Sequence, residues 1–303
     1  MPRYLKSLNP DLVIFHYTFL AERNDADKFN KLLRLIGFIK AFKCRKALVP
    51  HDEQYRADYL CSFCNDFGVT HIFTPAEPSE WARIYQGINL SSVTFHTVLT
   101  GYVDEKMVRR LKKRSKNLDD RPVDIGYRAW DSYPFYGRHG LLKGNIGHKF
   151  KEMVPNYNLV ADISTSPQDA FYGNSWYDFL LKCKYTIGVE GGSGILDRDG
   201  SIEEHTREYL RKHHKLNFEE VEAAIFPGMD GCFNYRLLGP RHLEAVITRT
   251  CQILVEGHYG GVLEPGKHYI ELKKDFSNIG EVLSLMREDK ERIRIVNCAY
   301  RDV

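Results

Sequence analysis

Gly239-Pro240-Arg241-His242-Leu243-Glu244-Ala245 is the stretch that decides the fold, because it joins a turn to the start of an amphipathic helix. Proline suits the first position of a helix, where its missing N–H would have no partner in any case. The apolar residues that follow recur at helical spacing, at Leu243, Val246, Ile247 and Cys251. A strand is predicted at 253–255, so the stretch predicts a helix entrance that leads into a sheet.

The same helix entrance is a candidate anion site. Free backbone N–H groups at a helix N-terminus attract phosphate, and Arg241 adds a fork of donors that suits phosphate or carboxylate. Glu244, one turn further along, offers oxygens that would accept hydrogen bonds from sugar hydroxyls. A plain helix start with a surface ion pair is the simpler interpretation of the same residues.

Length and composition describe a globular chain with two domains. The 303 residues are 43% hydrophobic and 27% charged, and a chain of this length is long for one core. No run reaches the ~18 apolar residues of a membrane helix, and the N-terminus lacks the apolar core of a signal peptide. Seven scattered cysteines fit a reducing compartment, so we expect a cytoplasmic protein. Cys61 and Cys64 form a lone CxxC without a second pair, which favours buried thiols over zinc.

The first part of the chain alternates apolar strands with helices. We expect strands at 12–15, 46–49, 69–74 and 92–99, with helices at 25–43 and 55–67 and another opening at Ser79. Continuous apolar runs are typical of strands buried on both faces, so we expect a parallel sheet with helices on both faces. Ligands of such folds bind beyond the carboxyl ends of strands. That position singles out His16, His51, Asp52 and Glu53.

A second α/β series follows a charged linker at 118–122 and predicts domains of 1–118 and 119–303. Its first strand, 123–128, is followed by a stretch with glycines at 137, 140, 144 and 147, which we expect to form a loop before a helix through Met153. Glycines let a backbone approach a ligand closely. Positive charge there comes from Arg128, Arg138 and Lys143. Glu190 ends a later strand, at 185–189.

Two charged motifs carry a functional and a simpler interpretation. The helix expected at 104–117 holds seven Lys and Arg residues, which suit an anionic membrane surface or a polyanionic acceptor. A solvated helix near a domain junction is favoured, and nothing aromatic interleaves it to indicate nucleic acid. Asp197-Arg198-Asp199 has the DxD pattern of a divalent-cation site. It is more simply a loop before a helix capped by Ser201 and Glu204.

Several blocks together resemble bacterial polysaccharide glycosyltransferases of the GT-B type. The Arg241-His242-Leu243-Glu244-Ala245 helix start, with 264–270 and 274–278, looks like the donor domain of that family. Further similar blocks lie at 50–56, 99–105, 124–128, 172–177 and 188–200. The sequence departs from the pattern at one point, since retaining members often carry a glutamate where Arg236 stands here.

The resemblance implies an α/β fold of two Rossmann-like domains with parallel sheets facing a central cleft. The C-terminal domain would bind a nucleotide-diphosphate sugar without a metal or other cofactor, and the N-terminal domain would shape the site for a saccharide or lipid-linked acceptor. The expected donor-binding residues are Arg128, Lys143, Pro240, Arg241 and Glu244. The candidate catalytic bases are His16, Asp52, Glu53 and Glu190.

The expected function is therefore hexosyl transfer in surface polysaccharide assembly, by a cytoplasmic enzyme with a peripheral contact to the inner membrane face and no nucleic-acid partner. Two alternatives stay open. A sugar-nucleotide 2-epimerase uses the same architecture without an acceptor. A non-catalytic nucleotide-sugar-binding protein would account for the missing glutamate at Arg236.

Overall fold

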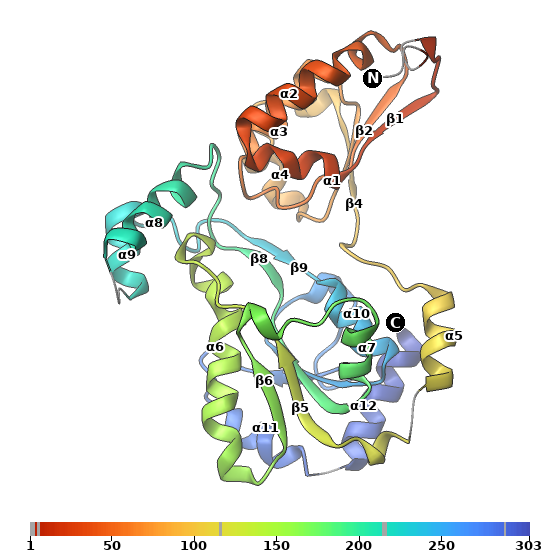
Figure 1. Cartoon of the computed structure of the whole chain (residues 1–303), viewed down its shortest axis with the longest axis vertical. Coiled ribbons are helices and arrows are strands. Elements are labelled where there is room, and N and C mark those ends of the chain that lie inside the picture. The colour runs from red at the N-terminus through yellow and green to blue at the C-terminus, as the bar shows by residue number, and fades with distance from the viewer. Residues whose placement is uncertain (1–3, 5–6, 115–116, 214–216, 288) are drawn as a thin grey trace. The chain divides into compact units, whose positions relative to one another are not determined.

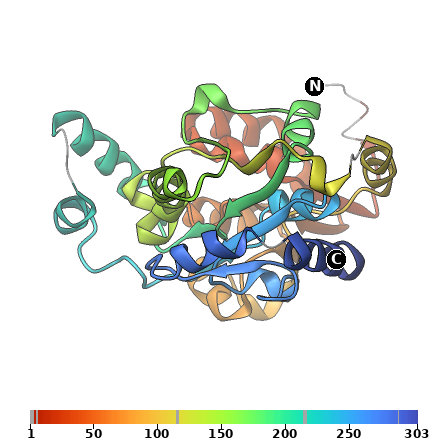
Figure 2. The same cartoon turned by 90° about the horizontal axis from the view of Figure 1, so that it is seen from below.

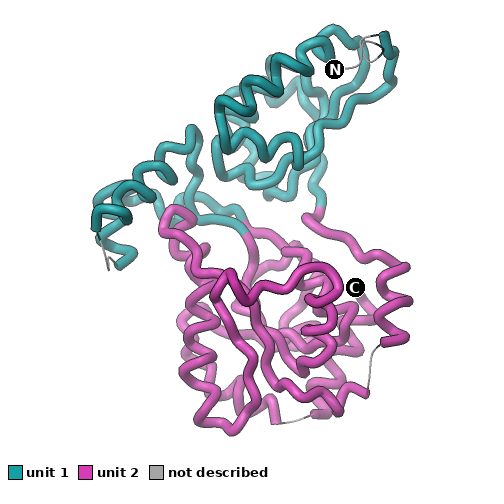
Figure 3. Tube along the Cα trace, viewed as in Figure 1, with its two compact units in different colours: residues 1–98, 192–235 teal, residues 99–191, 236–303 magenta. Residues whose placement is uncertain are grey.

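The chain folds into two compact α/β units (Figure 3). The computed structural model describes residues 4, 7–114, 117–213, 217–287 and 289–303. Unit 1 comprises Met1–Val98 and Gly192–Tyr235, and unit 2 comprises Leu99–Gly191 and Arg236–Val303. Each unit has a parallel sheet of its own, which confirms the expected α/β class. Among the described residues, no helix combines the length and apolar character that a bilayer crossing requires.

Unit 1 is built on a four-stranded parallel sheet in the order β1-β2-β3-β4 (Figure 1). Its strands are β1 (Leu12–Phe15), β2 (Arg45–Leu48), β3 (His71–Thr74) and β4 (Thr94–Thr97). Its connecting helices are α1 (Tyr17–Leu20), α2 (Ala26–Ile36), α3 (Ala57–Phe67) and α4 (Pro78–Ile84). Aromatic rings fill the core between sheet and helices: Phe15 packs edge-on against Phe63 at 4.8 Å, and Phe63 stacks on Phe67 at 4.5 Å.

Only one face of this sheet is covered, which corrects the expectation of strands buried on both faces. Phe15 is buried, but Leu12 and Ile14, which point to the opposite face, are exposed. The strands follow one another in sequence order, and successive right-handed crossovers place every connecting helix on the same side. The apolar run therefore predicted the strand correctly, but it did not predict that helices cover only one face of the sheet.

Residues 192–235 leave the second half of the chain and belong to unit 1. They carry α8 (Ser201–Lys212) and α9 (Phe218–Ile225), and they lie between the paired short strands β8 (Gly191–Ser193) and β9 (Tyr235–Leu237). An isolated bridge pairs Tyr55 with Asp197 and joins this segment to the first part of unit 1. Sequence periodicity cannot detect such an excursion, because it depends on a contact between residues far apart in the chain.

Unit 2 is built on a five-stranded parallel sheet in the order β11-β10-β7-β5-β6. Its strands are β5 (Val123–Arg128), β6 (Ala161–Ser164), β7 (Cys183–Gly188), β10 (Cys251–Val255) and β11 (Ile270–Leu272). Its helices are α5 (Glu105–Arg114), α6 (Gly137–Met153), α7 (Asn174–Leu180), α10 (Pro240–Ile247), α11 (Ile279–Leu285) and α12 (Asp289–Asp302). The main core packs Ile125, Ile187 and Ile253 of the sheet against Phe150 of α6 and Leu283 of α11. The helix α6 runs along the sheet and is seen end-on in Figure 2.

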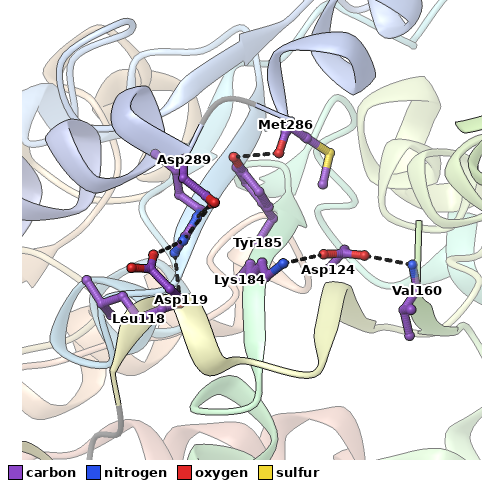
Figure 4. Close-up of polar contacts among 9 residues, drawn as sticks. Leu118, Asp119, Asp124, Val160, Lys184, Tyr185, Met286 and Asp289 are labelled. Carbon is purple, nitrogen blue, oxygen red and sulfur yellow. Dashed lines mark hydrogen bonds and ion pairs between the residues drawn. The ribbon is translucent and has the colours of Figure 1, made fainter. Parts of the chain in front are cut away.

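Polar contacts hold the amino end of this sheet together (Figure 4). Lys184 Nζ lies 2.9 Å from Asp124 Oδ1, and Asp124 Oδ2 accepts the Val160 N–H at 2.8 Å, so one carboxylate links three strand starts. Buried Arg292 of α12 binds Asp119 Oδ1 at 2.9 Å and donates to the Leu118 carbonyl at 3.1 Å. The segment expected to be a linker is therefore anchored to unit 2.

The first unit boundary lies between Val98 and Leu99 and not at residue 118. The basic helix α5, expected at the end of the N-terminal domain, belongs to unit 2. It buries Leu111, and its Arg110 and Arg114 bind Asn174 and Asp178 of α7. Charge and a proline marked a loop correctly, but packing decides which unit the loop belongs to.

The glycine-rich stretch is a helix, α6, and not the expected loop. Its glycines form a close-packed face: a Cβ on Gly144 would lie 2.3 Å from Asp131 Oδ1, and one on Gly147 would lie 2.9 Å from Thr165 Cγ2. Glycine normally weakens a helix by roughly 1 kcal/mol relative to alanine. Here tight packing against the rest of unit 2 outweighs that propensity.

Candidate functional site

A pocket lies where the strand order of unit 2 reverses. From β5 the chain passes to β6 on one side and then returns to β7 on the other, so β5 and β7 flank the switch point. Ligands of open α/β sheets bind there, beyond the carboxyl ends of the strands. The pocket has a volume of about 230 Å³ and lies among the ends of β5, β7 and β10, the start of α10, and α6 and α7.

Arg241 stands at the mouth of this pocket on the first turn of α10. Pro240 occupies the start of the helix, as the sequence predicts. The exposed guanidinium of Arg241 donates from Nη1 to the Arg128 carbonyl at 2.7 Å. It also lies over the rings of Trp130 and Trp176, 5.9 Å and 5.4 Å from their centroids. These contacts hold a cation at a helix N-terminus, a place that favours anions.

Glu244 lies one turn along the same helix and is held by α7. Its Oε2 accepts the indole N–H of Trp176 at 2.7 Å, and the Tyr177 hydroxyl lies 3.5 Å from Oε1. A carboxylate offers about four acceptor positions, so two donors leave room for further hydroxyl groups. Glu244 is half-buried, which leaves those positions accessible from solvent.

Lys143 lines the same pocket from α6. Its backbone carbonyl accepts the Tyr127 hydroxyl at 2.9 Å, which ties this turn of α6 to the end of β5. The structure therefore brings Lys143, Pro240 and Arg241 together around one pocket, as the sequence predicted. Arg138, the other cation of this stretch, is exposed.

Two polar side chains that sequence reasoning missed lie deeper in the pocket. Thr186 of β7 and Gln252 of β10 are register partners on neighbouring strands, and both line the pocket. They are 8% and 2% exposed. Neither side chain makes a hydrogen bond with any other residue that the structure describes. Both residues line the pocket without a protein partner, so this pair is suited to a ligand that offers hydrogen-bonding groups.

His242 was also missed, although it lies beside Arg241 in the deciding stretch. Its ring lines the pocket, faces Tyr259 edge-on at 5.1 Å, and has Nδ1 3.1 Å from the Gly239 carbonyl. Burial lowers the pKa of His242 to about 4. Burial likewise lowers the pKa of His139, on α6, to about 3. Both imidazoles are therefore neutral near pH 7.

Arg128 reaches the pocket with its backbone but not with its charge. The guanidinium binds Asp162 Oδ1 at 2.6 Å and the Asp162 carbonyl at 2.8 Å, and Nε donates to the Asp169 carbonyl at 3.0 Å. It also lies 4.5 Å from the Phe179 ring. These contacts use the donors expected for a phosphate, so the geometry gives Arg128 the role of holding Arg241.

Glu190 supports a turn beside the pocket. Its buried carboxylate accepts the Tyr259 N–H at 2.6 Å, and a Cβ on Gly257 would lie 2.5 Å from Glu190 Oε2. Tyr259 has a φ of +48°, a strained value for a residue with a side chain. The carboxylate therefore stabilises a strained turn, and the geometry favours this role over that of a base.

The candidate bases of unit 1 divide into exposed and buried groups. His16 is exposed at the start of α1, and its Nδ1 accepts the Thr18 N–H at 3.4 Å. Asp52 is exposed, has a φ of +54°, and lies 2.9 Å from His51 Nδ1. Desolvation opposes the charged form of Asp52, but the hydrogen bond and charge of His51, together with Gln54 and Arg23, outweigh it and lower the pKa of the carboxyl.

Glu53, by contrast, is fully buried. Its oxygens accept the hydroxyls of Thr74 at 2.8 Å, Tyr235 at 3.1 Å, and Tyr85. Burial raises the pKa of Glu53 in spite of these donors. Nearby Arg23, also buried, donates to the carbonyls of Leu20, His51, Asp52 and Tyr55. We call these residues the Glu53–Arg23 network, and its saturation gives Glu53 a structural role.

In the DxD motif, the Asp197 carboxylate forms hydrogen bonds with the backbone at the start of α8. Buried Asp197 accepts the backbone N–H groups of Gly200 at 2.9 Å, Ile202 at 3.3 Å and Glu203 at 2.9 Å, and thereby caps α8 in place of Ser201. Arg198 forms an ion pair with Asp58. Within the described ranges, no group of three or more His, Cys, Asp or Glu residues is placed to hold a metal ion.

The chain was compared with known proteins. No protein-family model matches it, and no curated protein matches it. Among solved structures it is similar to TarM, with a TM-score of 0.51 and 10% identity over 88% of this chain and 48% of TarM. It is also similar to Anabaena Alr3699/HepE in complex with UDP-glucose, with a TM-score of 0.40 and 10% identity over 96% of this chain and 73% of HepE.

The likeness to TarM at this identity concerns the fold alone, and the chain spans about half the length of TarM. The lower score for HepE does not strengthen it. Together with the two parallel sheets, the likeness confirms an α/β fold of the GT-B type with two Rossmann-like units.

Proposed function

We propose that the chain is a glycosyltransferase that moves a sugar from a nucleotide-diphosphate sugar to a saccharide or lipid-linked saccharide acceptor in surface polysaccharide assembly. One observation carries the proposal: a single pocket at the β5/β7 switch point has cations at its mouth and an unpartnered amide and hydroxyl inside. An anion joined to a planar, hydrogen-bonding ring matches this arrangement. A cytoplasmic location, expected from the cysteines, is part of the proposal.

The donor would be oriented by the pocket and by Glu244, which binds the pocket residue Trp176. Arg241, Lys143 and the start of α10 would bind the diphosphate, and Glu244 would bind the ribose hydroxyls. The base would face Thr186 and Gln252. A cavity of about 150 Å³ already holds one six-membered ring, so a pyrimidine base fits within the 230 Å³ found here.

Transfer breaks the bond from the sugar to the diphosphate oxygen and forms a bond to the acceptor oxygen. Negative charge grows on the departing diphosphate, and a helix N-terminus with Arg241 and Lys143 would stabilise it without a metal ion. The acceptor hydroxyl must lose a proton to a base. His16 and Asp52 are the exposed candidates from unit 1, since Glu53 and Glu190 are engaged in structural contacts.

A thermal-shift screen of the whole chain tests the donor site. UDP, GDP, dTDP, CMP and their sugars would be added with and without EDTA, since a ligand of the folded state raises the melting temperature. We expect a shift with a pyrimidine nucleoside diphosphate that survives EDTA and is lost in Arg241→Ala and Glu244→Ala. A shift abolished by EDTA would contradict the metal-independent mechanism. If no nucleotide raised the melting temperature, the proposed donor site would be wrong.

A non-catalytic binding protein is the second candidate, and Arg236 at the place of a glutamate favours it. Incubating the chain with the nucleotide sugar that stabilises it, with and without saccharide acceptors, separates the classes. Sugar transferred to an acceptor supports the glycosyltransferase. Epimerised sugar without an acceptor indicates the 2-epimerase, and a thermal shift without any turnover indicates the binding protein.

A further inference from the structure

The outward face of α5 is a stripe of positive charge. Met107, Val108 and Leu111 point toward unit 2, and Leu111 is buried. At 3.6 residues per turn, Lys106, Arg109 and Lys113 follow one line on the opposite side, with Lys112 beside it. All four side chains are exposed, and Glu105 is the single acid within the helix.

Most of this charge is not used to hold the fold. Arg110 and Arg114 bind α7, and Arg109 lies 2.8 Å from the exposed Glu105. Lys106, Lys112 and Lys113 form no ion pair with any residue in the described part of the chain. Arg109 follows Lys106 by three residues and precedes Lys113 by four, and like charges at these spacings destabilise a helix slightly, so the stripe is suited to an external anion.

Two exposed tyrosines precede the contacting helices α5 and α7. Tyr102 precedes α5 and is 85% exposed, and Tyr172 precedes α7 and is 80% exposed. Asn174, two residues after Tyr172, binds Arg110 of α5. Tyrosine has an apolar ring and a polar tip, and it is enriched where hydrocarbon meets water at a membrane surface. We call Lys106, Arg109, Lys112, Lys113 and these two tyrosines the α5 face.

We propose that the α5 face binds an anionic lipid surface. Clustered lysines and arginines are attracted to acidic headgroups, and exposed tyrosines suit the interfacial layer. Single-stranded nucleic acid would instead need a charged groove with stacked aromatic platforms, whereas these cations stand on the outer side of one helix. The apolar side of α5 is packed in unit 2, so binding is electrostatic with shallow contact and does not insert the helix.

The α5 face is connected to the pocket through α7. Asn174 and Asp178 of α7 bind α5, while Trp176 and Tyr177 of the same helix hold Glu244. A lipid surface bound at α5 would therefore lie next to the helix that shapes the pocket rim. The lipid contact itself does not depend on the proposed transferase activity, and the two can fail separately.

Vesicle co-sedimentation of the whole chain tests the proposal. Phosphatidylcholine vesicles with and without phosphatidylglycerol would be compared at low and high salt. The triple variant Lys106→Gln/Lys112→Gln/Lys113→Gln removes three exposed charges, and Tyr102→Ser/Tyr172→Ser removes the rings. The matched control Lys273→Gln/Lys274→Gln/Lys290→Gln changes the net charge equally at other exposed positions of unit 2.

We expect the wild type to bind only vesicles with phosphatidylglycerol and to be released by salt. The lysine variant should bind roughly 100-fold more weakly, the tyrosine variant more weakly at every salt concentration, and the control as the wild type. Equal binding by the lysine variant and the wild type would overturn the proposal. So would binding to single-stranded RNA but not to vesicles. Nucleotide-induced thermal shifts should be the same in all four proteins, which separates this test from that of the donor site.

Discussion

Two groups of polar side chains in this molecule differ in how far their hydrogen bonds are satisfied. The Glu53–Arg23 network of unit 1 is closed, because three hydroxyls donate to the carboxylate and four carbonyls accept from the guanidinium. The pocket of unit 2 is open, because Gln252 and Thr186 have no partner among the described residues and Arg241 is exposed. Hydrogen bonding therefore separates a structural cluster from a binding site where the residue types alone do not.

The contrast has an energetic basis. A buried charge is tolerated when its hydrogen bonds are complete, and removing one partner of such a group is costly. In an open site the polar groups keep free hydrogen-bonding capacity, which a ligand can use when it binds. Substitutions in unit 1 should therefore change stability, and substitutions in the pocket should change binding.

Glu53→Ala should have the largest effect. It leaves three buried hydroxyls without an acceptor and removes the negative charge near Arg23, so we expect the free energy of unfolding of unit 1 to fall by about 3–5 kcal/mol. Urea titration of a Trp130→Phe/Trp176→Phe background, in which Trp81 alone reports on unit 1, would measure it. Tyr235→Phe removes one hydrogen bond and should cost about 1 kcal/mol. Similar stability of Glu53→Ala and its background would show that the network is not closed.

Lowering the pH should reduce the stability of unit 2, through its buried histidines. The unfolded chain protonates a histidine below its ordinary value of 6.5, whereas His242 stays neutral until about 4, so the unfolded state binds more protons between these values. His242 alone should then lower the stability of unit 2 by about 3 kcal/mol as the pH drops from 6.5 to about 4, and His139, with a pKa of about 3, should add a similar loss. Denaturation of a Trp81→Phe background would follow it, and His242→Gln should weaken the dependence.

The buried carboxyl of unit 1 should respond with the opposite sign. The pKa of Glu53 is raised above 4.5, so the folded state binds the extra proton and the contribution of Glu53 falls as the pH rises above 4.5. If both units became less stable as the pH fell from 6.5 to about 4, His242 and Glu53 would not control their pH dependence.

Glu244→Gln should weaken nucleotide binding and leave the fold intact. A hydrogen bond to a charged group contributes roughly 1.5–3 kcal/mol, so we expect the dissociation constant of the preferred nucleotide to rise about 10- to 100-fold. Isothermal titration calorimetry would measure the constant. Glu281→Gln, an exposed glutamate on α11, is the matched control and should bind as the wild type. Equal affinity of Glu244→Gln and the control would remove Glu244 from the site.

Gln252→Leu should change the free energy of unfolding least of these substitutions, while it lowers nucleotide affinity. Leucine removes an amide that has no protein partner, so the free energy of unfolding should change by less than about 1 kcal/mol while nucleotide affinity falls about tenfold. Thermal denaturation and titration of the same sample would measure both. Reduced stability with unchanged affinity would mean that Gln252 belongs to a closed cluster like that of Glu53.

Much of the local structure was predictable from sequence, because it depends on neighbours along the chain. The strands 12–15 and 123–128 were expected with the observed limits, and the helix start at Pro240 was confirmed. The prediction of a loop for the glycine-rich stretch was wrong, because close packing at Gly144 and Gly147 outweighs the low helix propensity of glycine. The bounds of the units were missed because residues 192–235 join unit 1 through long-range pairing.

The candidate site was predictable in part. Arg241, Lys143 and Pro240 were expected to bind a donor, and the structure places them around one pocket. Gln252 and Thr186 could not be found in this way, since a glutamine or threonine within an apolar strand gives no signal of its function. One weak signal was available: both interrupt strands whose other residues are mostly apolar.

The sequence by itself determined the α/β class, the order of most strands and helices, and the cationic helix entrance at Arg241, because periodicity, propensity and capping act over a few residues. Only the tertiary structure decided which polar groups are satisfied. It closed the network around Glu53 and used the charge of Arg128 internally, and it left Gln252 without a protein partner in a pocket. That outcome depends on which distant donors and acceptors meet, and no local pattern in the chain encodes it.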